Sequence, residues 1–111
     1  MRFLLFLAVF ASVAACQRTP EQQQDDAART DARQRGAAIE DKANAEADRL
    51  QQQASDLENQ ARQTGGMTGE RLRIRANALV QESKVVRKQA DMQADAIKEA
   101  ADARIKASKS R

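Results

Sequence analysis

The chain has 111 residues, with 19 basic and 16 acidic side chains, one cysteine and no histidine. Its three phenylalanines, Phe3, Phe6 and Phe10, all lie near the amino terminus, and tryptophan and tyrosine are absent. Without histidine, the chain lacks a common zinc ligand and the usual base for a serine nucleophile. A single cysteine cannot form a disulfide within the chain. We therefore expect no catalytic residues, no bound metal and no enzymatic activity.

The first predicted element is a signal peptide over residues 1–15. Its apolar stretch is shorter than the roughly 20 residues of a membrane-spanning helix, but it suits a secretion signal. The stretch ends in Val13-Ala14-Ala15-Cys16, which resembles the lipobox of bacterial lipoproteins. That resemblance implies cleavage before Cys16, a diacylglycerol on its thiol and an acyl chain on the new amino terminus. Residues 16–19 would then form a lipidated linker, and no other cofactor is expected.

The residue after the cysteine is Gln17 rather than aspartate. By the sorting rule known for enterobacterial lipoproteins, this implies attachment to the periplasmic face of the outer membrane. Two or three acyl chains together anchor a protein stably, whereas one does not. The alternative is an ordinary secretion signal followed by an unpaired thiol.

The segment after Cys16 is rich in helix-forming residues and poor in core-forming ones. Alanine, glutamine, arginine, glutamate and lysine fill it, and each favours the helical backbone. No proline follows Pro20, so nothing interrupts a long helix. Its large aliphatic side chains are Ile39, Leu50, Leu57, Leu72, Ile74, Leu79, Val80, Val85, Val86, Ile97 and Ile105. This composition predicts an all-α chain and argues against a compact monomeric globule.

Helix one is predicted over residues 20–64. Thr19 suits its cap, Pro20 suits its first position, and Gln22 can reach back to the cap. Farther along, apolar residues recur in alternating steps of four and three, the heptad pattern of a helix that packs along one seam. These residues are Ala43, Ala47, Leu50, Ala54, Leu57 and Ala61.

Three glycines predict a turn over residues 65–69, followed by helix two with a basic tail over residues 70–111. The second helix repeats the heptad spacing. Its seam consists of Leu72, Ala76, Leu79, Ser83, Val86, Ala90, Gln93, Ile97 and Ala100. If the chain folds back at the turn, facing residues have numbers that add to about 133, and large side chains then face small ones.

The matching seams predict a long antiparallel helical hairpin, similar to a coiled coil. Pairing of the seam with another chain is the alternative. Further apolar residues flank the seam and widen the apolar surface of each helix. One run of apolar residues has the spacing of a straight α-helix, which departs gradually from a strict heptad repeat. The flanking residues are Ile39, Val80, Ala94, Ala96 and Ala101, and this run is Ala90, Ala94, Ile97, Ala101 and Ile105. Dimerisation of hairpins into a four-helix bundle would bury this excess, so a homo-oligomer is expected.

Charged residues spaced four apart are expected to pair within each helix. The predicted pairs are Asp25 with Arg29, Asp31 with Arg35, Glu58 with Arg62 and Asp102 with Lys106. Such pairs sit on solvated helix surfaces and are the plain interpretation of most of the charge in this chain.

Two basic clusters are candidate contacts with anionic surfaces. One consists of Arg71, Arg73 and Arg75, at a helix start where positive charge is slightly unfavourable. Arg73 could pair with Glu58 across the seam, or the three could contact anionic peptidoglycan. The second cluster consists of Arg104, Lys106, Lys109 and Arg111, which suit a helix end and, in a hairpin, would lie near lipid head groups. Nucleic acid is not expected, because the predicted signal peptide implies export and the segment after Cys16 has no aromatic residues for stacking.

The predicted function is that of a lipid-anchored periplasmic spacer or adaptor, with peptidoglycan or an envelope protein as partner. The chain is similar in general plan to the murein lipoprotein family, which ends in a lysine that joins peptidoglycan. This chain instead ends Lys109-Ser110-Arg111. The alternative is a stress-protective or holdase protein of the envelope, since alanine-rich polar helices also resemble late-embryogenesis-abundant segments. A membrane-active peptide is a third class, disfavoured because the apolar face is mostly alanine.

Overall fold

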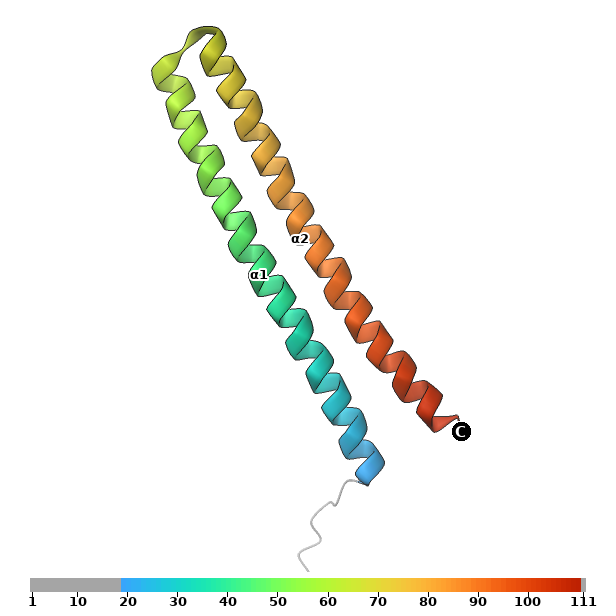
Figure 1. Ribbon diagram of the computed structural model, residues 1–111. Coiled ribbons are helices and arrows are strands. Elements are labelled where there is room, and N and C mark those ends of the chain that lie inside the picture. Colours follow the sequence, from blue (N-terminus) through green and yellow to red (C-terminus); the bar gives the residue numbers. More distant parts are fainter. Residues whose placement is uncertain (1–18, 111) are drawn as a thin grey trace, which may run out of the picture.

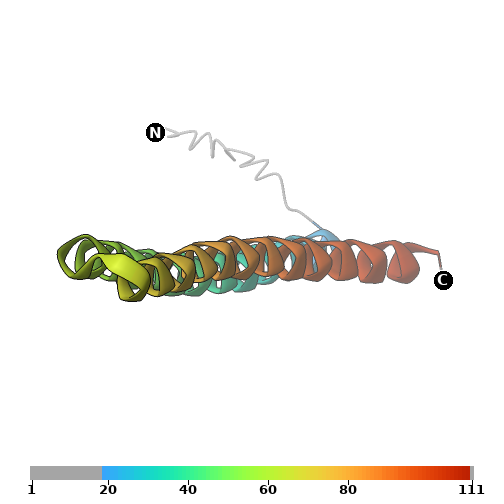
Figure 2. The same cartoon turned by 90° about the horizontal axis from the view of Figure 1, so that it is seen from above.

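Two long helices run antiparallel in the computed structural model, which describes residues 19–110 of the chain. Helix α1 spans Pro20–Thr64 and helix α2 spans Gly66–Lys109, with 45 and 44 residues. They lie side by side along their whole length (Figure 1). Seen from above, the pair forms one thin layer (Figure 2). The prediction of an all-α antiparallel hairpin is confirmed.

Helix α1 begins with the capping interactions that the sequence predicts. The Thr19 hydroxyl accepts a hydrogen bond from the backbone N–H of Gln22 at 3.2 Å, and the Gln22 side chain accepts one from the backbone N–H of Thr19 at 3.3 Å. Pro20 occupies the first turn, where its missing N–H removes no helical hydrogen bond. These interactions fix the start of α1 at Pro20, four residues after Cys16.

The turn is tighter than the sequence predicts. Only Gly65 lies between the helices, so α2 begins at Gly66 and not at residue 70. Gly65 and Gly66 have φ values of 64° and 62°, which glycine adopts without a steric penalty. Gly69 lies inside α2 for a different reason, because a Cβ there would come within 2.7 Å of the carbonyl oxygen of Ala61. The third glycine therefore allows close contact between the helices and takes no part in the turn.

Near the turn, the seam follows the predicted heptads, but small residues occupy its centre. Ala47, Ala54, Ala61 and Ala76 are at most 2% exposed. Ser83 is fully buried, and its hydroxyl donates to the carbonyl oxygen of Val80 at 2.7 Å. Of the predicted leucines, Leu50 is buried, and the others lie half-buried at the edges of the seam: Leu57, Leu72 and Leu79. Small central residues let the helix backbones approach closely.

Toward the ends of the chain, the seam departs from the heptad prediction. Gln93 and Ala100 are exposed, whereas Ala94 and Ile105 are 0% and 5% exposed. The seam of α2 therefore continues along Ala90, Ala94, Ile97, Ala101 and Ile105, whose spacing follows a straight helix. On α1, the buried residues Ala32 and Gly36 belong to the matching part of the seam. We expected the run from Ala90 to Ile105 to pack against a second copy, but it packs against α1 within the chain.

Cross-hairpin contacts confirm the register. Asp48 pairs with Arg87 at 2.7 Å, and a Cβ at Gly36 would touch the Cβ of Ala94 at 3.3 Å. The numbers of these residues add to about 133, as predicted for a chain that folds back at the turn.

Candidate functional site

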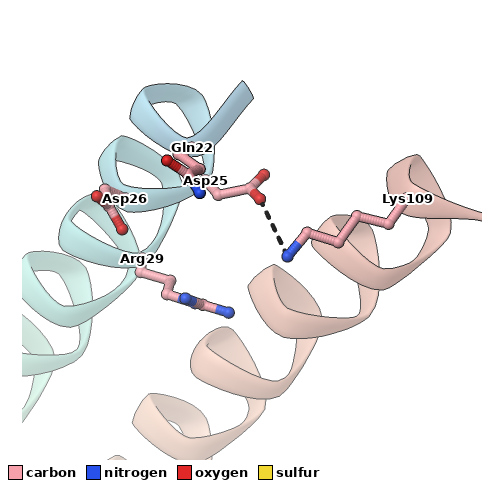
Figure 3. A pocket seen from close by; sticks show the side chains of 5 residues that line it. All are labelled: Gln22, Asp25, Asp26, Arg29 and Lys109. Atoms are coloured by element: carbon pink, nitrogen blue, oxygen red, sulfur yellow. Dashed lines mark ion pairs between the residues drawn. The ribbon is translucent and has the colours of Figure 1, made fainter. Parts of the chain in front are cut away.

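The open end of the hairpin, where α1 begins and α2 ends, contains a small charged cleft. It has a volume of about 370 Å³ and is lined by Gln22, Asp25, Asp26, Arg29 and Lys109. Figure 3 shows Lys109 reaching from the last turn of α2 toward Asp25 on α1, at a distance of 3.5 Å between Nζ and Oδ2. The Asp25 side chain is only 16% exposed, whereas that of Lys109 is 64% exposed. This ion pair brings the basic end of α2 to the start of α1.

Two ion pairs near the open end join α1 to α2 and not residues of one helix. Arg29 pairs with Asp102 at 3.5 Å, and Asp25 pairs with Lys109. The predictions that Asp25 pairs with Arg29 and Asp102 with Lys106 are therefore wrong. Helical spacing places these residues within reach of each other, but the adjacent helix offers an opposite charge at the same height.

Other predicted contacts have mixed outcomes. Asp31 pairs with Arg35 within α1 at 3.2 Å, as predicted. Arg73 pairs with Glu70 one turn earlier on α2, at 3.6 Å, and not with Glu58. Among the described residues, Arg71 and Arg75 form no ion pair.

The structure places the two predicted basic clusters at opposite ends of the molecule. Arg71, Arg73 and Arg75 lie in the first turns of α2, close to the Gly65 turn that we call the tip. The tip also exposes apolar side chains, with Met67 79% and Ile74 61% exposed.

The C-terminal cluster lies at the open end. Arg104, Lys106 and Lys109 are exposed there, and the two lysines occupy the last turn of α2. Cations at this position interact favourably with the negative end of the helix dipole. Arg111, like Cys16 and the predicted signal peptide, lies outside the described residues.

The two broad faces of the hairpin differ in chemistry. On one of them, which we call the apolar face, three shallow grooves lie along the seam. Their half-buried aliphatic residues are Leu57 and Leu79 near the tip, Ile39 and Val86 at mid-length, and Ile97 toward the open end. The groove residues of each helix recur in steps of three and four beside the seam, which keeps them on one side of the hairpin.

The opposite face, which we call the polar face, has charged residues close to the seam, with the half-buried Val80 among them. One groove there is lined by Arg29, Arg33, Lys98 and Asp102, with Ala32 and Ala101 at its base. The pair between Asp48 and Arg87 lies on the same side of the seam. Sequence reasoning missed this asymmetry, although the signal was present. Near the tip, small and large residues alternate along the seam of each helix, as in Ala47, Leu50, Ala54 and Leu57 on α1. The large residues occupy the equivalent heptad position on both helices and therefore lie on the same side of the hairpin.

Residues 19–110 contain no cluster of three or more potential metal ligands. The clefts are open grooves between charged side chains. Glu46 raises the pKa of the exposed Arg49 guanidinium, first through a hydrogen bond of 2.6 Å and then through its negative charge. That shift only strengthens a charge that arginine already carries at physiological pH.

Comparisons with protein families, curated proteins and solved structures give no match for this chain. Neither α1 nor α2 contains a stretch that is long and apolar enough to cross a membrane.

Proposed function

We propose that this chain is a lipid-anchored spacer or adaptor of the bacterial envelope, attached through acylated Cys16 to the periplasmic face of the outer membrane. The observation that supports it best is the coincidence of three features at one end of a rod. The lipobox-like motif precedes α1 directly, α1 begins at Pro20, and Lys109 returns to Asp25 beside that start.

In this arrangement, the open end lies at the membrane and the tip points away from it. A helix of 45 residues, at 1.5 Å per residue, carries the tip roughly 65 Å from the anchor. The basic residues Arg104, Lys106 and Lys109 would lie near anionic head groups, where each contributes up to about 1 kcal/mol at low salt. The acyl chains dominate the attachment, since each buried methylene contributes about 0.8 kcal/mol.

The tip is the part of the rod that can reach another layer of the envelope. Arg71 presents a guanidinium group that forms no ion pair among the described residues. The exposed Met67 and Ile74 side chains add apolar surface beside it. This surface suits an anionic partner, and peptidoglycan or an acidic envelope protein supplies that chemistry.

The experiment that tests the anchor is metabolic labelling with radioactive palmitate in the native bacterium. Wild-type protein should take up label and sediment with outer membranes. The Cys16→Ser variant should take up none and accumulate as an uncleaved or mislocalised precursor. The conservative substitution leaves α1 and α2 intact, so a loss of label reports on the thiol alone. A wild-type chain without label contradicts the proposal.

A further inference from the structure

We propose that the apolar face binds the same face of a second copy of this chain, in parallel, with the two-fold axis along the hairpin. The result is a four-helix rod in which both tips point the same way. The parallel orientation depends on the proposed function, because two copies anchored in one membrane must have their open ends together. The face, the partner and the pairing follow from the described residues.

A single hairpin leaves part of its apolar face exposed. In a thin two-helix layer, Leu57, Leu79 and Val86 are only half-buried, because no third element covers them. Val85 and Met92, which lie next to this face, are 51% and 63% exposed. Half-buried aliphatic side chains along about half the length of one face are typical of a helix pair that packs against another layer.

The half-buried aliphatic side chains extend from Leu57 to the height of Ile97, which is about 22 residues or roughly 33 Å of helix. With a width of about 15 Å, this surface would bury roughly 500 Å² per chain and about 1,000 Å² in total, the lower limit for a specific interface. A partner that covers it must be an equally long, straight and helical element. A second hairpin has this length, and its own apolar face supplies the complementary small and large side chains.

The charged residues of two apolar faces complement each other in a parallel dimer, where α1 of one copy lies over α2 of the other at the same height. Within one chain, cross-hairpin contacts join residues whose numbers add to between 130 and 135, and facing residues of two parallel copies follow the same rule. A sum of 131 places Asp56 opposite the partner's Arg75. It also places Arg49, which pairs with Glu46 in its own chain, opposite the partner's Glu82.

Both pairs join opposite charges, and the symmetry forms each of them twice. Asp56 and Arg75 line the same groove of one chain but form no ion pair with each other there. An antiparallel dimer would instead separate the two anchored ends by the length of the rod, roughly 65 Å.

The test uses two full-length copies with different epitope tags, co-expressed in the native bacterium. One copy carries Lys42→Cys and the other carries Gln89→Cys. Both residues are exposed, line the mid-length groove of the apolar face, and occupy the same height on opposite helices. Mild oxidation should produce a disulfide between the two differently tagged copies, while either copy expressed alone should form none through its added cysteine. A chain without added cysteines controls for Cys16.

Charge substitutions test whether the predicted ion pairs between the two copies hold the dimer together. Arg75→Asp in both copies should lower the cross-linked fraction at least about tenfold, because it places like charges opposite each other twice. Adding Asp56→Arg should restore cross-linking by reversing both members of the pair. Arg33→Glu, a charge reversal on the polar face, serves as the matched control and should leave the fraction unchanged.

The possible outcomes separate this inference from the proposed function. Disulfides only between identical cysteine positions would indicate an antiparallel dimer and overturn the proposal, as would the absence of any added-cysteine disulfide. Palmitate label without the mixed disulfide leaves the anchor standing and removes the dimer. The mixed disulfide without label supports the parallel dimer and removes the lipid anchor.

Discussion

The half of the hairpin near the tip and the half near the open end are held together differently. Near the tip, heptad spacing places leucines such as Leu50 and Leu79 over a line of small residues. Near the open end, the seam consists mainly of alanine and glycine, including Ala32, Gly36 and Ala94, and two ion pairs bridge the helices, compared with one in the tip half. Burial of a leucine stabilises by about 1.5 to 3 kcal/mol, whereas an exposed ion pair contributes about 0 to 1 kcal/mol.

The difference implies that the stability of the hairpin is concentrated at its tip. The change of spacing occurs at the same height on both helices, around Ala43 on α1 and Ala90 on α2. Between this level and the open end, the seam residues recur at intervals of eleven, which suits nearly straight helices. Heptads, in contrast, impose a left-handed supercoil. The tip half is therefore a short coiled coil, and the open half is a looser pair of straight helices that separates more easily.

The largest expected effect comes from removing a large side chain at the centre of the tip half. Leu50→Ala should lower the free energy of unfolding by about 2 to 4 kcal/mol, because Leu50 is 5% exposed and its loss leaves a cavity in the seam. Ile105→Ala, at an equally buried site near the open end, should cost less because the last turns of α2 open locally before the whole hairpin unfolds. Urea denaturation followed by circular dichroism at 222 nm measures both. Equal losses would remove the contrast between the two halves.

A smaller effect distinguishes the two buried helical glycines. Gly69→Ala should destabilise the hairpin by about 1 to 3 kcal/mol, because the new Cβ meets the Ala61 carbonyl oxygen at 2.7 Å and backbone cannot move aside cheaply. Gly36→Ala should be close to neutral. Its Cβ meets Ala94 at 3.3 Å in the looser half, and the gain in helix propensity of up to about 1 kcal/mol offsets the contact.

Thermal melting of the two variants side by side provides the measurement. The predicted order is Gly69→Ala well below wild type, with Gly36→Ala near it. If Gly36→Ala melts as low as Gly69→Ala, the open half is packed as tightly as the tip half, and the comparison fails.

The features that were predictable from the sequence are those fixed by local chemistry. The cap at Thr19 and Pro20 needs only neighbouring residues, and the register follows from the position of the glycines and the seam on each side of them. The all-α hairpin needed no more than this, because two seams of matching length leave few other ways to bury alanine.

The features that were missed depend on the other helix. Gly69 was assigned to the turn because its close approach to Ala61 is visible only once the helices are paired. Lys109 and Asp102 found partners on α1 for the same reason. In the candidate site, the positions of the basic clusters along the chain were evident, but which of their members form ion pairs was not. The difference between the two faces also requires knowing which seam positions lie at the centre.

The smallest expected effect concerns the ion pairs at the open end. Lys109→Gln removes the contact with Asp25, and Asp102→Asn removes the contact with Arg29, while each keeps a polar side chain of similar shape. Each should lower global stability by less than about 1 kcal/mol, and the loss should shrink further at high salt, where exposed charges are screened. The effect on local opening should be easier to detect. Amide hydrogen exchange over residues 20–36 and 97–109 should accelerate, whereas residues 47–61 and 72–90 should exchange as in wild type. Faster exchange throughout both helices would show that the hairpin opens as one unit, and that the ion pairs at the open end stabilise the tip half as well.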